Sequence, residues 1–250
     1  MYALLPWKLL STVLLIIVAV AVYVDDVFAL VGVSLPENVV VRALPVVLLT
    51  AFSVFFAPTG YYAPWRILWR LVPVLNNWFP DLNGVWVGKT STNGPTIRKL
   101  IEMAKSNQQL TEQELHDIPE QEDAMAVEIT NSLFSLRIDA GLSSTNAQSH
   151  SIAAKPWRHQ HTGRIHLSYV FQQETPKPAI TDEETHLGAA ELVLDSNGYA
   201  NAEGTYWTRR SWRTGRNTAG SISLTRKNPN KRKGKSLTEF AAEHKAQSED

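Results

Sequence analysis

The sequence predicts a membrane-anchored protein in which two transmembrane helices precede a small, all-β antiparallel barrel with a short helical insertion. Three observations support this fold class. The residues up to Pro80 carry few charges and contain two long apolar runs, whereas the rest of the chain is polar. In the polar part, apolar residues alternate with polar ones, which is the pattern of half-buried strands. Turn residues such as Asn197-Gly198 separate these alternating segments.

The membrane hairpin is predicted over residues 1–58. Its first apolar run extends from Leu9 to Val24 and the second from Val39 to Ala57. A spanning helix needs about 20 apolar residues, and both runs approach this length once their neighbours are included. No small-x-small cleavage site follows the first run, so the pattern favours a retained span over a secretory signal peptide.

The charges around the two spans predict their orientation. Lys8 precedes the first span, and Arg66 and Arg70 follow the second, whereas the connection between the spans contains acidic residues such as Asp25 and Glu37. Basic residues accumulate on the cytoplasmic side of a membrane. Both chain termini are therefore expected in the cytoplasm.

A juxtamembrane segment is predicted over residues 59–80. On a helix, Trp65 and Trp69 form an aromatic stripe beside Arg66 and Arg70, as in helices that lie at a membrane surface. An ordinary buried linker helix is the alternative interpretation of the same pattern.

The soluble domain is predicted over residues 81–228, and it opens with a strand at 82–88 in which Trp86 can plug one end of a barrel. A helix is expected at 96–107 and a shorter one at 111–117, where Thr-Glu-Gln-Glu forms a capping box. The acidic stretch 112–128 is interpreted as a solvated insertion.

The strands follow from residue parity. Val127, Ile129 and Asn131 share one face, and the parity then changes near Ser132, which indicates a bulge or a hairpin. Further strands are expected at 149–154, at 165–172 with Ile165, Leu167, Tyr169 and Phe171 facing inward, and at 186–195, 199–209 and 218–227. About seven or eight strands result, and closing them into a barrel removes exposed edges.

The early Gly-x-Trp strand and the late Arg226 predict a calycin-like arrangement of this barrel. Residues 229–250 are expected to form a basic, flexible tail, in which 236–250 is a loose amphipathic or disordered end.

The composition excludes several classes of chemistry. The chain has no cysteine, so it has no disulfide, zinc-thiolate site or thiol nucleophile. It contains no nucleophile elbow, phosphate loop or dinucleotide fingerprint. His159, His161 and His166 lie close in the sequence without a carboxylate at ligand spacing, so no metal site is predicted. We therefore expect no catalytic residue and no cofactor, and we do not expect an enzyme.

The most distinctive polar segment extends from Tyr206 to Lys235. It contains Arg209, Arg210, Arg213 and two tryptophans, and no acidic residue. Arginine suits phosphate oxygens, and aromatic faces suit nucleobases. A basic collar that contacts anionic lipid headgroups is the alternative.

Several motifs, taken in order, resemble one family. They are Phe-Pro-Asp-Leu-Asn-Gly-Val-Trp-Val-Gly at 79–88, His-Leu-Gly at 186–188, Gly-Thr-Tyr-Trp-Thr-Arg-Arg at 204–210 and Thr-Ala-Gly-Ser-Ile at 218–222, behind two spans. The family is that of the SMODS-associated two-transmembrane, β-strand-rich effectors of CBASS antiphage systems. Relative to that pattern, the insertion at 112–128 and the tail after Lys227 are long.

The resemblance implies a receptor for a cyclic dinucleotide, which a neighbouring CD-NTase makes after phage infection. It also implies homo-oligomerisation on ligand binding and disruption of the bacterial inner membrane, with a minimal, STING-like function on a different fold. DNA and RNA polymers are not expected as partners. The residues expected to bind the ligand are Arg209, Arg210, Arg213, Tyr206, Tyr169, Thr208, Asn131 and His186.

Within this prediction, the arginines bind the two phosphates, and Tyr169 and Tyr206 stack on or hydrogen-bond a base. Asn131 and His186 are expected to read base edges. Two other functions remain open from the residues alone. The barrel could carry a lipid or another apolar small molecule, or it could be a membrane-anchored scaffold without a ligand.

Overall fold

The computed structural model describes residues 64–78, 80–132, 135–178, 183–196, 198–227 and 234–249, with a few isolated positions before 64. The chain divides into two compact units. One comprises Met1–Asp81 with Asn131–Ser135, and the other comprises Leu82–Thr130 with Leu136–Asp250. The two predicted membrane spans lie outside the described residues.

In the first unit, helix α4 (Pro64–Leu71) is followed by the 3-10 helix η2 (Pro73–Asn77). The predicted juxtamembrane helix therefore ends before Pro73, because proline restricts the preceding residue to extended conformations. Trp69 is buried, whereas Trp78 is exposed. None of the helices among the described residues combines the length and the apolar character needed to cross a membrane.

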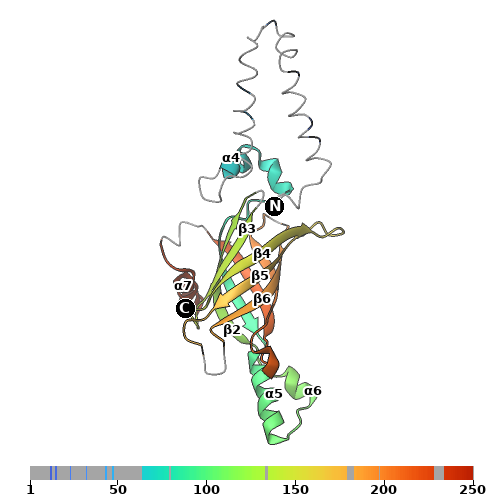
Figure 1. Ribbon diagram of the computed structural model, residues 1–250, viewed down its shortest axis with the longest axis vertical. Coiled ribbons are helices and arrows are strands. Elements are labelled where there is room, and N and C mark those ends of the chain that lie inside the picture. Colours follow the sequence, from blue (N-terminus) through green and yellow to red (C-terminus); the bar gives the residue numbers. More distant parts are fainter. Residues whose placement is uncertain are drawn as a thin grey trace. The chain divides into compact units, whose positions relative to one another are not determined.

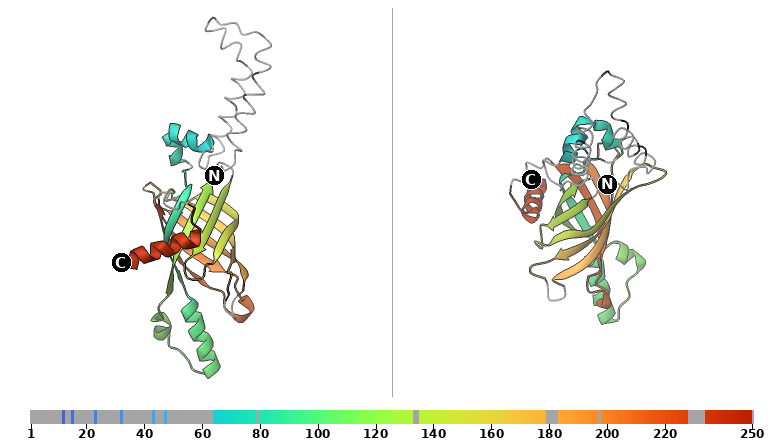
Figure 2. Two further views of the ribbon diagram at one scale, coloured as in Figure 1. Left: turned by 90° about the vertical axis from the view of Figure 1, so that its left-hand side faces the viewer. Right: turned by 45° about the horizontal axis from the view of Figure 1, so that its top comes forward.

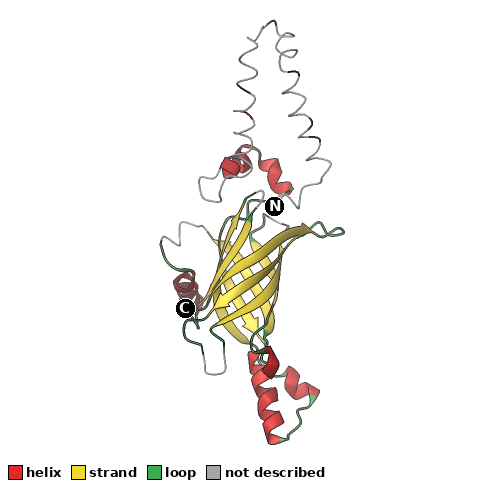
Figure 3. Ribbon diagram, in the orientation of Figure 1, coloured by secondary structure: helices red, strands yellow, loops and turns green. Residues whose placement is uncertain are grey.

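The second unit is a closed barrel of eight antiparallel strands, each hydrogen-bonded to its neighbours in sequence, with β8 closing on β1 (Figures 1 and 3). The strands are β1 (Gly84–Thr92), β2 (Gln121–Asn131), β3 (Leu136–Leu142), β4 (Gln148–Arg158), β5 (Ile165–Glu174), β6 (Thr185–Leu194), β7 (Asn201–Thr208) and β8 (Ala219–Lys227). The predicted barrel is confirmed, and the parity change near Ser132 is the connection between β2 and β3.

One end of the barrel is closed by packed side chains. Trp86 is completely buried there, and the guanidinium carbon of Arg226 lies 5.8 Å from the centroid of its ring. Arg226 Nη2 also donates a hydrogen bond to the Asn83 carbonyl at 2.6 Å. Leu167 and Leu192, both fully buried, belong to the same core. The expectation that Trp86 plugs the barrel is confirmed, and Arg226 covers the plug.

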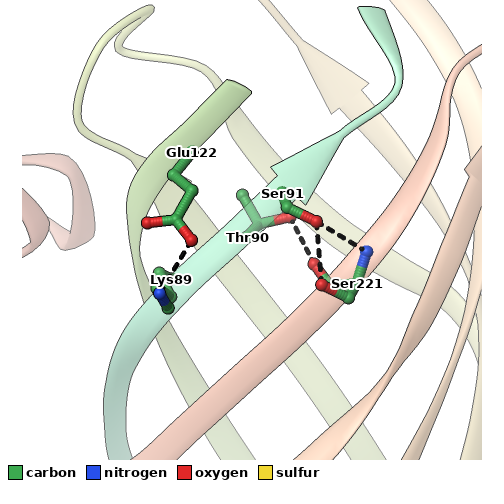
Figure 4. A network of polar contacts seen from close by, with 5 residues as sticks. All are labelled: Lys89, Thr90, Ser91, Glu122 and Ser221. Carbon is green, nitrogen blue, oxygen red and sulfur yellow. Dashed lines mark hydrogen bonds and ion pairs between the residues drawn. The ribbon is translucent and has the colours of Figure 1, made fainter. Parts of the chain in front are cut away.

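A network of polar contacts joins β1 to its neighbours (Figure 4). Ser91 Oγ lies 2.8 Å from Ser221 Oγ on β8, and the Thr90 hydroxyl donates to the Ser221 carbonyl at 3.0 Å. On the other side of β1, Lys89 forms an ion pair with Glu122 of β2 at 2.7 Å. These contacts reinforce the seam at which the last strand meets the first.

The helical insertion connects β1 to β2 and projects beyond the barrel (Figure 1). It contains α5 (Gly94–Ser106) and α6 (Glu112–His116). The predicted capping box is confirmed, because Thr111 and Glu114 exchange both hydrogen bonds, which lower the pKa of the Glu114 carboxyl. The expectation of a solvated insertion up to residue 128 is wrong for its second half, because β2 already begins at Gln121.

A last helix, α7 (Leu237–Glu249), packs on the outer surface of the barrel against β1 and β3 (Figure 2). Leu237, Phe240 and Ala241 form an apolar cluster with Val85, Val87 and Ala126. Of the two expectations for 236–250, a loose amphipathic end or a disordered one, the disordered end is therefore wrong for the helical residues. The spacing i, i+3, i+4 of the three apolar side chains places them on one face of the helix.

Candidate functional site: an open cavity opposite the plugged end

The barrel opens into a cavity at the end where α5 begins, opposite the plug. Its volume is about 230 Å³. Polar side chains dominate near the opening, and aromatic and aliphatic ones lie further in. The lining consists of Thr90, Thr92, Gly94, Arg98, Gln121, Asp123, Met125, Ala140, Leu142, Ser144, Thr145, Ala147, Ser149, Tyr169, Phe171, Gln173, Thr175, Tyr206, Thr208, Arg210, Thr218 and Ile222.

Aromatic rings form the inner part of the cavity wall. Tyr169 and Phe171 are adjacent inward residues of β5, with ring centroids 6.0 Å apart. Burial raises the pKa of the Tyr169 phenol above its ordinary value, so the side chain stays neutral and can donate a hydrogen bond. Tyr206 of β7 adds a third ring. Such faces can stack on a flat heteroaromatic group.

A glycine on the neighbouring strand makes room for an aromatic ring of this wall. Gly188 of β6 pairs with Phe171, and a Cβ at Gly188 would lie only 2.3 Å from the Phe171 ring. Gly220 of β8 pairs with Tyr206. A Cβ at Gly220 would collide with the Ser91 carbonyl of β1 and would also lie 3.0 Å from the Tyr206 ring. Both glycines belong to motifs that the sequence analysis singled out.

Two arginines from different elements line the opening. Arg210 follows β7, and its Nη2 donates to His186 Nε2 at 3.4 Å; the imidazole must be the acceptor, because a guanidinium has only donors. Arg98 lies on α5, and its Nη2 donates to Gln121 Oε1 at 3.3 Å. The cavity therefore presents two permanent positive charges, and the hydrogen-bond partners of each guanidinium include a neutral side chain.

The one carboxylate among the described lining residues belongs to Asp123, and the protein itself uses both of its oxygens. Oδ1 accepts from the Ser143 hydroxyl at 2.7 Å, and Oδ2 accepts from the Ser144 hydroxyl at 2.6 Å. Asp123 thus fixes the turn between β3 and β4. These hydrogen bonds stabilise the charged form of the carboxylate, so the opening carries one fixed negative charge beside the two guanidinium groups.

The structure brings together half of the residues predicted from sequence. Arg210, Tyr206, Tyr169 and Thr208 line the cavity. The Thr208 hydroxyl is already paired with that of Thr218 at 2.9 Å, so it serves the wall of the barrel. His186 is buried and contacts Arg210, which makes it a positioning residue and not an obvious reader of base edges.

The other three predicted residues do not line the cavity. Arg209 is exposed after β7, and Arg213 is exposed with its guanidinium carbon 5.8 Å from the centroid of the Trp212 ring. Both lie in the same loop as Arg210. Asn131 ends β2, at the far end of this strand from Asp123, and its Nδ2 donates to the Pro80 carbonyl at 3.4 Å.

The loop that carries these arginines, between β7 and β8, is hydrogen-bonded to the connection between β5 and β6. It contains the short 3-10 helix η3 (Trp212–Thr214), flanked by Ser211 and Gly215 in the left-handed region. The Ser211 backbone N–H donates to Glu183 Oε1 at 3.1 Å. The contact holds the two connections together at the open end.

Gln173, Thr175 and Arg98 are among the polar lining residues that sequence reasoning missed. Gln173 and Thr175 continue the inward parity of β5, so extending that alternation by two steps would have found them. Arg98 belongs to the first turns of α5, which starts directly after β1. The Gly94-Pro95 pair marks that start, but periodicity does not show that the helix begins at the opening.

A barrel with one plugged end and one open cavity, lined by aromatic rings and arginines, is suited to receive a small anionic ligand. A family model described as "Cap15, cyclic dinucleotide receptor domain" matches residues 77–226. The match covers more than half of the chain, so the protein belongs to this family. The resemblance to CBASS effectors that carry a cyclic-dinucleotide receptor domain is thereby confirmed.

A relative supports the same conclusion. The chain is 28% identical over 164 residues to the CD-NTase-associated protein 15 of Escherichia albertii, and the similarity spans 64% of this chain and 71% of the relative.

Proposed function

We propose that this protein is an antiphage effector that binds a cyclic dinucleotide in the open cavity of its barrel. One base of the ligand packs against the rings of Tyr169, Phe171 and Tyr206. The phosphates bind the guanidinium groups of Arg98 and Arg210. The observation that carries the proposal is the pair of arginines at the opening of an aromatic cavity, within a receptor-domain family.

The chemistry of the ligand matches this arrangement. A cyclic dinucleotide carries two phosphodiester charges, and the opening provides two guanidinium groups from separate elements. Hydrogen bonds to a charged partner contribute about 1.5–3 kcal/mol each. His186 holds the Arg210 guanidinium in place before the ligand arrives, which reduces the entropy lost on binding.

The size of the cavity suggests how binding is coupled to assembly. Pockets for drug-sized ligands usually have volumes of about 300–1,000 Å³, and this cavity has about 230 Å³. One half of a cyclic dinucleotide would occupy it, and the other half would remain near Arg209, Trp212 and Arg213. A second copy of the chain could then cover this exposed half.

The output of the receptor is proposed to be assembly in the bacterial inner membrane. Residues 1–58 would provide two spans with cytoplasmic termini, and ligand-driven oligomerisation would bring several hairpins together and disrupt the bilayer. A ligand shifts such an equilibrium only through its higher affinity for the assembled state. The exposed apolar side chains Ile67, Leu71 and Val74 support contact of the juxtamembrane segment with a membrane surface.

The test is a calorimetric titration of the full 250-residue chain with cyclic di-AMP, cyclic di-GMP, cyclic GMP–AMP and cyclic di-UMP. The double variant Arg98→Ala, Arg210→Ala should weaken binding of the preferred ligand at least about 100-fold. Arg164→Ala is the matched control, because Arg164 is exposed at the turn after β4 and does not line the cavity.

If the double variant binds a cyclic dinucleotide as tightly as the parent chain, the assignment of the site is wrong. Binding of a fatty acid that is indifferent to both arginines would favour the apolar-carrier function instead. Replacing residues 1–58 by a soluble tag should abolish killing of infected cells and leave ligand binding intact, and killing by the tagged form would refute the proposed output.

A further inference from the structure

The hydroxyl group of Thr175 is a buried polar group that the fold does not use. Thr175 directly follows β5, is 3% exposed and lines the cavity. Among the described residues, its Oγ1 has no hydrogen-bond partner. Burying a hydroxyl without a partner is unfavourable, and each such group in a native structure calls for an explanation.

Other threonines of the cavity wall are satisfied by the protein. The Thr90 hydroxyl donates to the Ser221 carbonyl at 3.0 Å, and the Thr208 hydroxyl pairs with that of Thr218 at 2.9 Å. The backbone N–H of Thr175 donates to the Glu184 carbonyl at 2.8 Å, which fixes the residue between the start of β6 and the end of β5. Thr175 is therefore held in place while its side chain keeps an unused donor.

The strand register places this donor near Arg210. Thr175 is two residues beyond Gln173 on the same face of its strand, and Gln173 pairs with His186. His186 in turn accepts the hydrogen bond from Arg210. Thr175, Gln173, His186 and Arg210 thus form one polar corner of the opening, in which the Thr175 hydroxyl, the Gln173 amide and the Arg210 guanidinium carry donors for an anion.

We propose that Thr175 Oγ donates a hydrogen bond to a non-bridging oxygen of the phosphodiester that Arg210 binds. This inference rests on the proposed function and makes it more specific, because it assigns one of the two phosphates to the polar corner. Arg98, on the insertion helix, is then left for the other phosphate.

The experiment compares the full-length parent chain with Thr175→Val and Thr175→Ser, using the cyclic dinucleotide that binds most tightly and its phosphorothioate analogue. Valine preserves the shape of threonine and removes the hydroxyl, so the affinity of Thr175→Val should fall about tenfold. Thr175→Ser should retain most of the affinity. The matched control for affinity is Thr205→Val, because Thr205 is exposed on the outer face of β7.

The phosphorothioate analogue tests which ligand atom is contacted. Sulfur accepts a hydrogen bond poorly, so substitution at the contacted oxygen should weaken binding to the parent chain and have little further effect on Thr175→Val. If the loss of binding free energy from Thr175→Val and the loss from the sulfur substitution simply add, Thr175 contacts another part of the ligand. The phosphate assignment would then be wrong.

Stability without ligand gives a second readout. Thr175→Val should unfold at the same temperature as the parent chain or at a higher one, whereas Thr90→Val should unfold at a lower temperature because it loses a made hydrogen bond. If the parent chain binds and Thr175→Val binds equally well, the inference fails and the proposed function stands. If the parent chain binds none of the four ligands, both fail.

Discussion

The two ends of the barrel use the same residue types for opposite purposes. At the plugged end, the Arg226 guanidinium lies against a buried tryptophan and donates to a backbone carbonyl, so its charge is used within the fold. At the open end, Arg210 contacts a neutral histidine and faces a cavity. The comparison teaches that an arginine beside aromatic rings indicates a ligand site only where the space in front of it is not filled.

The largest expected effect of a single substitution is at the plug. Trp86→Ala should lower the free energy of unfolding by about 3–5 kcal/mol, because it leaves a large cavity in the closed core. Chemical denaturation measures this change. Trp207→Ala is the control, because Trp207 is 53% exposed on the outer wall, and its effect should stay within about 0.5 kcal/mol. Equal losses for the two variants would contradict the distinction between a plug and a wall.

The same substitution at the two arginines separates folding from binding. Arg226→Ala should cost about 1.5–3 kcal/mol of stability through the lost bond to the Asn83 carbonyl. Arg210→Ala should cost less stability than Arg226→Ala and should weaken ligand binding. Denaturation and calorimetry of both variants provide the measurement. A larger loss of stability in Arg210→Ala than in Arg226→Ala, or an Arg226→Ala that weakens binding but keeps its stability, would reverse the roles assigned to the ends.

Gly188→Ala affects the aromatic wall between the two ends. The added Cβ would meet the Phe171 ring and the Trp207 carbonyl, so the ring must move. We expect a loss of about 1–3 kcal/mol from this overpacking, together with weaker ligand binding. Thermal unfolding and titration test both effects, and Gly163→Ala serves as a comparison at an open turn, with strain from its positive φ alone. A fully stable Gly188→Ala would show that Phe171 is not constrained.

The smallest expected effect concerns pH. Burial raises the pKa of Tyr169 above the value of 10.0 that it has when exposed. The stability contributed by the neutral phenol is therefore complete below about pH 10 and is lost as the pH rises through the native pKa. By pH 11 the parent chain should have lost on the order of 1 kcal/mol relative to Tyr169→Phe. The measurement is the free energy of unfolding of both proteins between pH 8 and 11. An equal change with pH in the two proteins would contradict this expectation.

The barrel could be predicted from sequence because alternation reports the inward face of each strand. Alternation does not report the height of a residue along the barrel. Asn131 and Tyr169 have inward parity alike, yet Tyr169 lines the cavity and Asn131 ends its strand next to Pro80. Height depends on strand register and shear, which arise from pairings between strands far apart in the sequence.

The remaining errors have a similar origin. Arg98 reaches the cavity because α5 starts where β1 ends, and a helical pattern alone carries no information about that position. The C-terminal helix is rich in polar residues, and it is stabilised by packing against Val85 and Val87 rather than by its own propensity. Local patterns therefore predicted the elements, and tertiary contacts decided which residues share a site.

The position of α7 has a practical consequence for fragments of this protein. The region shared with the receptor family ends at residue 226, but the outer surface of β1 is apolar and is covered by Leu237 and Phe240. A fragment trimmed to the shared region would expose these strand residues to water and favour aggregation. Expression boundaries for crystallisation or ligand screening should therefore extend through Glu249, so that α7 continues to cover the apolar outer surface of β1.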